Sequence, residues 1–126
     1  MPAPVLVVDS DPDLIASYEL LLRRCGCRVL SARSRREALG YLSRGPVQLV
    51  IVDAGLADGS GLDVVRIASG GRTPPAAIIV TGSPGDRVGR RAFEAGATSY
   101  VSKPIGLSAF TALLDGLLRA IGKGDR

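Results

Sequence analysis

Four short apolar runs of this sequence are each followed, at once or after one residue, by a polar residue that could do chemistry. The runs and the residues after them are 5–8 with Asp9, 49–52 with Asp53, 76–80 with Thr81, and 99–101 with Lys103. If the runs are parallel strands of one sheet, these residues meet at its carboxyl edge, where open α/β sheets bind ligands. Two carboxylates, a hydroxyl and an ammonium at such an edge suit a phosphoryl group with a hard metal ion.

The elements that would position these residues alternate between strand and helix along the chain. Besides the four runs, residues 28–30 are expected to form a short second strand, and the segments between strands carry apolar residues at helical spacing. The five helices are expected at residues 12–25, 35–44, 62–69, 86–95 and 107–121. Alternation of five strands with five helices predicts a parallel sheet covered by helices on both faces.

Local signals mark several helix ends. Asp11 followed by Pro12 is typical of a helix start, because the carboxylate caps the helix and proline suits its first turn. Ser34 and Glu37 form a capping box that predicts the start of the second helix. Gly26 is typical of the residue that ends a helix.

The composition indicates one globular domain. A chain of 126 residues with 46% hydrophobic residues can bury a core without disulfides or structural metal. We expect this domain to span residues 1–121, and residues 122–126 to be a polar tail or the start of a linker. No apolar stretch approaches the length of a membrane span, and no signal sequence is recognisable. We therefore expect a cytoplasmic protein without membrane contacts.

Two compositional features exclude classes of function. The sequence has no histidine, which excludes a Ser-His-Asp or Cys-His catalytic pair and any phosphohistidine on this chain. Cys25 and Cys27 have no further cysteine or histidine to complete a zinc site, so we interpret them as ordinary thiols. The net charge of +4 comes from scattered arginines without a nucleic-acid-binding motif, and we do not expect direct nucleic-acid binding.

Across almost its whole length, the chain resembles a receiver domain of a two-component response regulator. The residues that carry the resemblance are Asp53 after the third strand, Gly61 eight positions on, Thr81 with Gly82, Tyr100, and Lys103 with Pro104. The resemblance implies a flavodoxin-like, doubly wound α/β domain with a five-stranded parallel sheet in the order 2-1-3-4-5. It also implies a signalling domain rather than an enzyme, with at most autophosphorylation and autodephosphorylation activity.

The resemblance further implies a role for each residue. Asp53 would accept a phosphoryl group from a sensor histidine kinase or phosphotransfer protein, with Lys103 offsetting negative charge and Thr81 donating to a phosphoryl oxygen. Thr81 and Tyr100 would form a switch read by a downstream protein or output domain. The expected phosphate-binding residues are Ala54, Gly82 and Lys103, and the expected Mg²⁺ ligands are Asp9, Ser10, Asp53 and the backbone carbonyl of Gly55.

Two positions depart from the family pattern. The family usually has two adjacent acids after the first strand, whereas this chain has Asp9 followed by Ser10. Because a hydroxyl replaces a carboxylate there, we expect Mg²⁺ to bind weakly. Asp11 follows, but capping the first helix would aim its side chain elsewhere. Ala57 stands where the family often has proline.

Two other functions remain open. Ser10 is the best support for a pseudo-receiver, an interaction module that works without phosphorylation. Residues 7–11 and 78–82 also resemble the first two motifs of haloacid-dehalogenase-type phosphatases. Asp13 departs from the first of these motifs, and no acidic metal-binding pair follows Lys103, which weighs against that phosphatase.

Several smaller expectations complete the analysis. Asp58 and Asp63 are interpreted as helix caps, and Tyr18 and Tyr41 as packing residues. The Lys103-Pro104 bond is expected to be cis, as in the family. Residues 97–100 lack the acidic residues with which related domains pair arginines when they dimerise. The isolated domain is therefore expected to be monomeric or weakly dimeric.

Overall fold

Five parallel strands form the centre of the molecule. The computed structural model describes residues 3–82 and 86–124. The strands are β1 (Val5–Val8), β2 (Val29–Ala32), β3 (Leu49–Asp53), β6 (Ala76–Thr81) and β7 (Ser99–Ser102). They lie in the order β2-β1-β3-β6-β7, and every neighbouring pair is parallel. Numbered along the sheet-forming strands alone, this order is 2-1-3-4-5, which confirms the prediction.

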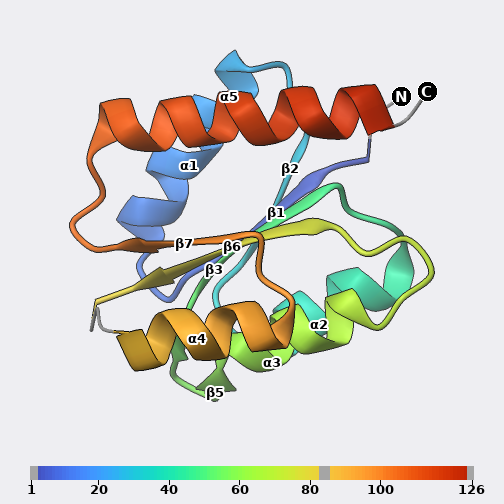
Figure 1. The fold of residues 1–126 in the computed structure, drawn as a ribbon, viewed down its shortest axis with the longest axis vertical. Helices are drawn as coiled ribbons and strands as arrows, with labels where there is room; N and C mark the ends of the chain where they lie inside the picture. The colour runs from blue at the N-terminus through green and yellow to red at the C-terminus, as the bar shows by residue number, and fades with distance from the viewer. Residues whose placement is uncertain (1–2, 83–85, 125–126) are drawn as a thin grey trace.

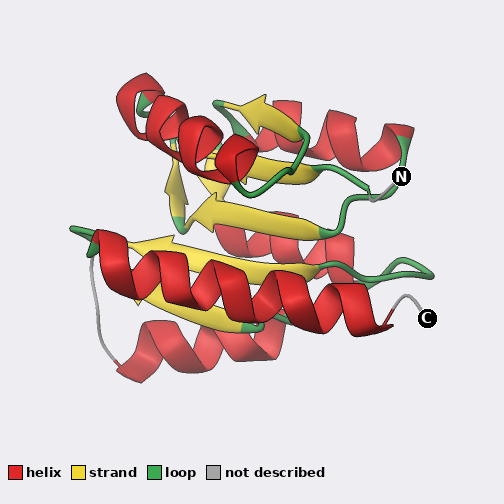
Figure 2. Ribbon diagram, turned by 90° about the horizontal axis from the view of Figure 1, so that it is seen from above, coloured by secondary structure: helices red, strands yellow, loops and turns green. Residues whose placement is uncertain are grey.

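Helices cover both faces of this sheet. They are α1 (Pro12–Arg24), α2 (Arg35–Arg44), α3 (Gly61–Ser69), α4 (Asp86–Ala95) and α5 (Leu107–Gly124). Figures 1 and 2 show α1 and α5 on one face, and α2, α3 and α4 on the other. None of the helices in the described part of the chain is long and apolar enough to cross a membrane.

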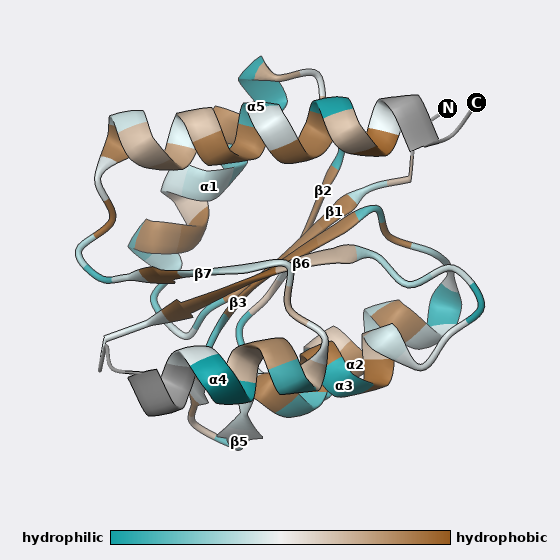
Figure 3. Ribbon diagram, in the orientation of Figure 1, coloured by the Kyte–Doolittle hydropathy of each residue, from teal (hydrophilic) through white to brown (hydrophobic). Residues whose placement is uncertain are grey.

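The strands form because their side chains are apolar on both faces of the sheet. All four residues of β1 are fully buried, as are Leu49, Val50, Ile51 and Val52 of β3. Alternate residues of each strand contribute to two separate core clusters, one under α1 and α5 and one under α2, α3 and α4. Figure 3 shows this apolar sheet passing between amphipathic helices. The two buried layers hold the carboxyl ends of the strands rigidly in register.

The predicted helix starts are largely confirmed. The Asp11 carboxylate accepts a hydrogen bond from the Asp13 N–H at 2.9 Å, and the Ser34 hydroxyl accepts one from the Glu37 N–H at 3.1 Å. Gly26 follows α1 with φ at 81°, a conformation that favours glycine. The interpretation of Asp63 as a cap was wrong. Ser60 caps α3 instead, because its hydroxyl precedes the helix and accepts the Leu62 N–H at 3.1 Å.

Some element boundaries differ from the sequence-based expectation. Strand β2 was expected at residues 28–30 but is Val29–Ala32, because Ser31 and Ala32 pair with β1 despite weak strand propensity. Helix α5 continues to Gly124, past the expected end at Ile121. Glycine has a low helix propensity, but each residue added to an existing helix contributes a backbone hydrogen bond that offsets it. The segment between β3 and α3, for which no strand is expected from the sequence, contains a small hairpin of β4 (Gly55–Leu56) and β5 (Gly59–Ser60).

The two tyrosines pack as expected. Tyr18 is almost fully buried, and its ring centroid lies 5.7 Å from that of Phe110. Its hydroxyl has no hydrogen-bond partner in the described structure, and burial, together with the charges of Asp9 and Asp53, raises its pKa. Tyr41 packs on the edge of a core cluster, with the Arg44 guanidinium 5.5 Å from its ring centroid.

Candidate functional site

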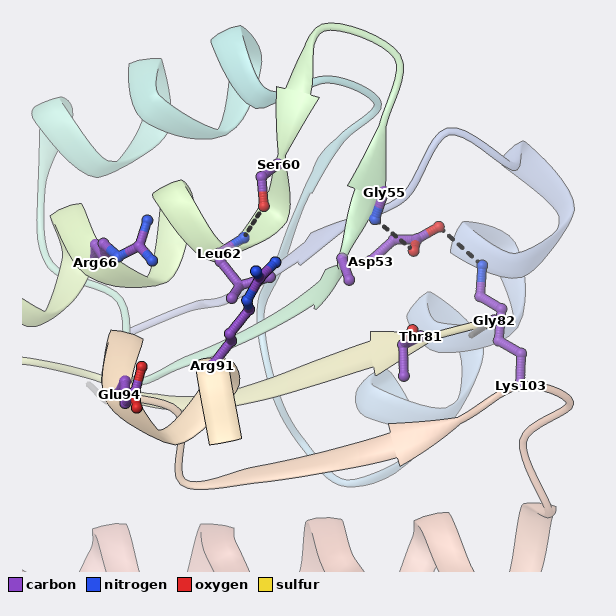
Figure 4. Close-up of a pocket in the computed structure, with 11 residues that line it drawn as sticks. Asp53, Gly55, Ser60, Leu62, Arg66, Thr81, Gly82, Arg91, Glu94 and Lys103 are labelled. Atoms are coloured by element: carbon purple, nitrogen blue, oxygen red, sulfur yellow. Dashed lines mark hydrogen bonds and ion pairs between the residues drawn. The ribbon is translucent and has the colours of Figure 1, made fainter. Parts of the chain in front are cut away.

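A polar pocket opens at the carboxyl edge of the sheet. Its volume is about 840 Å³, and it contains Asp53 from the end of β3, Thr81 from the end of β6, and Lys103 from just after β7. Figure 4 shows these side chains approaching one another across the pocket. The strand ends therefore bring together residues that lie up to 50 positions apart in the sequence, as the opening pattern of the sequence predicts.

Lys103 bridges two strand-end carboxylates, that of the buried Asp9 and that of the partly buried Asp53. Its ammonium nitrogen lies 2.9 Å from Oδ2 of Asp53 and 3.1 Å from Oδ2 of Asp9. Burial alone lowers the pKa of Lys103, but the hydrogen bonds to Asp53 and Asp9 outweigh this effect, so the pKa is raised above its ordinary value. The ammonium is therefore held in its charged form between the carboxylates.

The backbone fixes where Lys103 stands. Its N–H donates to the Thr81 carbonyl at 2.7 Å, which extends the pairing of β6 and β7 by one bond. The Lys103-Pro104 peptide bond is cis, as predicted. Thr81 itself is 4% exposed, so its side chain sits at the floor of the pocket beside the ammonium.

The Asp53 carboxylate is held at both oxygens. Oδ2 accepts from Lys103, and Oδ1 accepts from the Gly55 N–H at 3.1 Å. Ala54 also lines the pocket, but its N–H already donates to the Val80 carbonyl at 2.8 Å as part of the sheet. Gly55 therefore presents the N–H of this loop to the carboxylate, a contact that sequence reasoning missed because it depends on the loop conformation.

Gly61 is required by close packing beneath Asp53. A Cβ atom at position 61 would lie 1.9 Å from the carbonyl oxygen of Asp53, far closer than any carbon and oxygen approach without bonding. The Gly61 N–H donates to the Ala54 carbonyl at 2.9 Å, which closes the loop. Gly82, in contrast, has open space where its Cβ would be, and it lines the pocket next to Thr81.

Asp9 and Asp53 are the acids that face each other here. Asp9 is 1% exposed, and its Oδ1 accepts the Asp11 N–H at 2.9 Å. Ser10 is exposed, and its carbonyl accepts from the Arg33 guanidinium at 3.4 Å. Asp11 caps α1, as expected. In the described part of the chain, no three acidic, cysteine or histidine side chains gather to hold a metal ion.

The donor set still fits a hard cation. Two carboxylates and a neighbouring backbone carbonyl offer only oxygen ligands, which are the ligands that Mg²⁺ prefers together with water. The set carries two negative charges where a second acid after Asp9 would add a third. The residues present therefore suit a hydrated Mg²⁺ held by fewer anionic ligands than the family pattern provides.

Tyr100 lies on β7 but does not line the pocket. Its ring packs against α4 at Gly89, where a Cβ would lie 2.7 Å from the ring, and its centroid is 6.1 Å from that of Phe93. Phe93 is 53% exposed, so the two rings form an aromatic pair near the surface. Sequence reasoning missed Gly89, although a glycine inside an amphipathic helix is a signal of close packing.

The far wall of the pocket is basic, which sequence reasoning also missed. Arg66 of α3 and Arg91 of α4 line it with Glu94, and Figure 4 shows Arg91 reaching from α4 towards α3. Arg66 pairs with Asp63 at 3.1 Å. The arginines are scattered along the sequence, and helical periodicity alone could not show that two of them face this opening.

The geometry favours Asp53 over Asp9 as the reactive carboxylate. Asp53 lines the pocket, whereas Asp9 lies behind it and is almost fully buried. A phosphatase of the haloacid-dehalogenase type would need its second acid, here Asp11, at the reaction centre. The Asp11 carboxylate is instead bonded to the N-terminal turn of α1.

Comparison with known proteins identifies the family. A profile of the response regulator receiver domain matches residues 5–115. The chain belongs to this family. It is 34% identical over 116 residues to the transcriptional regulatory protein KdpE of Mycobacterium tuberculosis, covering 91% of this chain and 50% of KdpE. It is 36% identical over 116 residues to the response regulator protein PilR of Pseudomonas aeruginosa, covering 90% of this chain and 26% of PilR.

Solved structures show the same fold. A CheY-like receiver domain protein from Methanospirillum hungatei has a TM-score of 0.89 at 24% identity, covering 98% of this chain and 99% of that one. The BeF3-activated DrrB receiver domain has a TM-score of 0.85 at 26% identity, and the match covers 94% of this chain and 99% of that one. This receiver domain is thus a signalling domain of two-component systems, and it spans about half or less of the two curated relatives described above.

Proposed function

We propose that this receiver domain accepts a phosphoryl group on Asp53 from a partner histidine kinase or phosphotransfer protein. The observation that carries the proposal is the ammonium of Lys103 held 2.9 Å from Asp53 at an open pocket. A carboxylate attacks a phosphoryl group poorly unless the negative charge of both is offset, and this ammonium supplies that offset. The absence of histidine in this chain requires the donor histidine to belong to the partner.

In the transfer step, an oxygen of Asp53 forms a bond to phosphorus while the bond from phosphorus to the partner's imidazole nitrogen breaks. The imidazole keeps the electron pair of that bond. Lys103 and the Thr81 hydroxyl interact with oxygens of the phosphoryl group as it moves, and the exposed backbone of Gly82 leaves room beside them. Asp9, Asp53 and the Gly55 carbonyl would hold Mg²⁺, which would offset charge on the phosphoryl oxygens.

The same site would act as a switch. Once the phosphoryl group is in place, Thr81 would move towards it, and Tyr100 on the neighbouring strand would repack against α4. Tyr100 already lies against Gly89 and Phe93, so its movement would change the surface formed by α4, β7 and α5. A downstream protein or an output domain would read this surface. KdpE is a transcriptional regulatory protein, and this chain matches half of it.

The domain itself is proposed to act without direct nucleic-acid contacts and as a monomer or weak dimer. Its arginines are dispersed over several helices, and residues 97–100 provide no acidic partner for Arg90 or Arg91. The second candidate function is a phosphorylation-independent interaction module. Ser10 favours it, because the metal site then lacks the charge of the usual second acid.

Intact-mass measurement after incubation with Mg²⁺ and acetyl phosphate tests the proposal. The wild-type chain should gain one phosphoryl mass, and Asp53→Asn should gain none because the amide is not a nucleophile. Asp9→Asn serves as the control, since it removes a carboxylate behind the pocket and should slow the reaction without abolishing it. A phosphoryl mass on Asp53→Asn but not on Asp9→Asn would support the phosphatase-like reaction instead. No gain in any variant would favour the interaction module.

A further inference from the structure

The loop that supplies the Gly55 carbonyl is closed at its base by the hydrogen bond from the Gly61 N–H to the Ala54 carbonyl, but its tip has little to hold it from within the loop. Its hairpin consists of two strands of two residues each, paired at Gly55 with Ser60 and at Leu56 with Gly59. A hairpin this short is not stable by itself. Ala57 stands at its turn in place of the proline that the family often has, so the sequence also provides no constraint on φ there. Something outside the loop must hold it.

Asp58, at the tip of this hairpin, is bonded to the start of a different helix. Its two carboxylate oxygens accept the N–H groups of Arg35 at 2.8 Å and Arg36 at 3.0 Å. These are the first two residues of α2, whose N–H groups have no partner within the helix. The positive end of the helix dipole adds a favourable interaction with the carboxylate. Asp58 therefore caps α2 from more than 20 positions away in the sequence.

A second contact holds the other side of the tip. The Arg35 side chain lies across Gly59, so closely that a Cβ on Gly59 would be 2.8 Å from Arg35 Cδ. Nε of the same arginine lies 3.4 Å from Oδ2 of Asp63 in α3. The backbone hydrogen bonds from Arg35 and Arg36 lower the pKa of Asp58, so this carboxylate stays charged. The hairpin tip, although exposed, is thus linked to the start of α2 by both contacts.

We propose that Asp58 is a positioning residue for the metal-binding loop. By tying the hairpin tip to the N-terminus of α2, it fixes the backbone of Gly55 beside Asp53, which a proline at position 57 would otherwise help to do. The proposal rests on the proposed function in so far as the Gly55 carbonyl is a Mg²⁺ ligand. The position of Gly55 can nevertheless be followed without metal, because its N–H donates to Asp53 Oδ1 at 3.1 Å.

The test compares Asp58→Ala with wild type by amide hydrogen exchange and Mg²⁺ titration, both followed by NMR. In the metal-free protein, the amides of Arg35, Arg36 and Gly55 should all exchange faster in the variant. Its Mg²⁺ dissociation constant should rise by about tenfold, the usual effect of losing a residue that orients a ligand. Asp115→Ala, which removes an exposed carboxylate from α5, controls for the change in net charge and should alter neither quantity.

A rescue variant separates positioning from helix capping. Leu56 is in an extended strand, the conformation that a following proline favours, so Ala57→Pro is compatible with the loop. In the double variant A57P/D58A, Gly55 protection and Mg²⁺ affinity should recover while Arg35 and Arg36 stay unprotected. Unchanged Gly55 exchange and unchanged Mg²⁺ affinity in Asp58→Ala would overturn the proposal and leave Asp58 as a helix cap only. An equal loss of Mg²⁺ affinity in Asp115→Ala would overturn it as well.

The outcome for this loop is distinguishable from the outcome for phosphorylation. If no variant gained a phosphoryl mass while Asp58→Ala still loosened Gly55, the proposed function would fail and the anchoring role of Asp58 would stand. If wild type were phosphorylated and Asp58→Ala left Gly55 as protected as before, the proposed function would stand and the anchoring role would fail.

Discussion

Two turns each carry a carboxylate that Lys103 contacts, and packing constrains them very differently. The turn after β3 carries Asp53, and its conformation leaves no space for any side chain at Gly61. The turn after β1 carries Asp9, which is buried, but the next residue, Ser10, faces solvent. The fold therefore dictates residue types after β3 and leaves position 10 free to vary.

This difference accounts for the departure at Ser10, whereas the other departure, Ala57, lies in the turn after β3. A substitution at Gly61 would disturb the backbone of Asp53, the proposed phosphorylation site, and the stability of the domain together. A substitution at position 10 changes the charge of the site with little effect on packing, because that side chain is exposed. The side chain at position 10 can thus change without loss of the fold, and the expected cost is confined to the proposed metal site.

The largest expected effect is at Gly61. Gly61→Ala should destabilise the domain by about 3 kcal/mol, because the new methyl group overlaps the carbonyl oxygen of Asp53. Urea unfolding measures this loss. Gly55→Ala is the matched control in the same loop, since its Cβ would meet no atom within 4 Å, and it should change stability by less than about 1 kcal/mol. Equal losses in both variants would contradict the close packing of Gly61 against Asp53 on which the tight constraint of this turn rests.

The sequence predicts the ends of the strands better than it predicts the contacts between distant elements. Continuous apolar runs such as residues 49–52 predict buried parallel strands, and their ends bring Asp53, Thr81 and Lys103 to one edge. The sequence could not show that Arg91 lines this edge, because helical spacing does not reveal what an exposed face lies next to. Asp58 was correctly interpreted as a helix cap, yet the helix that it caps begins more than 20 residues before it in the sequence. Only tertiary packing makes that contact.

The next effect in size is the loss of the ammonium that links the two turns. Lys103→Met keeps much of the side-chain volume but leaves Asp9, 1% exposed, without its charged partner. We expect a loss of about 2 kcal/mol, below the usual cost of breaking a fully buried pair because Lys103 is 29% exposed. Phosphorylation should also slow. Arg119→Met removes a cation from an exposed ion pair and should cost less than about 0.5 kcal/mol.

Mg²⁺ should change the size of the stability loss in Lys103→Met. Since Mg²⁺ would neutralise the carboxylates that Lys103 bridges, adding it should stabilise Lys103→Met more than it stabilises wild type. Unfolding measured with and without Mg²⁺ gives the comparison. Equal stabilisation of both proteins would mean that the ammonium and the metal ion do not share the carboxylates of Asp9 and Asp53.

A smaller effect is expected from restoring the usual acid after β1. Ser10→Asp adds a carboxylate ligand and should tighten Mg²⁺ binding by about tenfold, or about 1.4 kcal/mol, and speed phosphorylation with it. Ser10→Asn has nearly the same shape without the charge and should leave the affinity close to wild type. Isothermal titration measures both. If neither affinity nor phosphorylation improved with Ser10→Asp, the metal explanation of this position would be wrong and the interaction module would become the better function.

The smallest expected effect tests whether a neighbouring acid already replaces the missing one. Asp11 is one residue beyond Ser10, but its carboxylate is bonded to the Asp13 N–H at 2.9 Å and so points at α1. Asn caps helices about as well as Asp, so Asp11→Asn should keep the fold and change Mg²⁺ affinity by less than about twofold, or about 0.4 kcal/mol. The same titration, in parallel with Asp9→Asn as the variant expected to lose most affinity, measures the difference. A tenfold loss in Asp11→Asn would show that Asp11 leaves its capping position to bind the metal ion, and the turn after β1 would then contribute two carboxylates to the site where the turn after β3 contributes one.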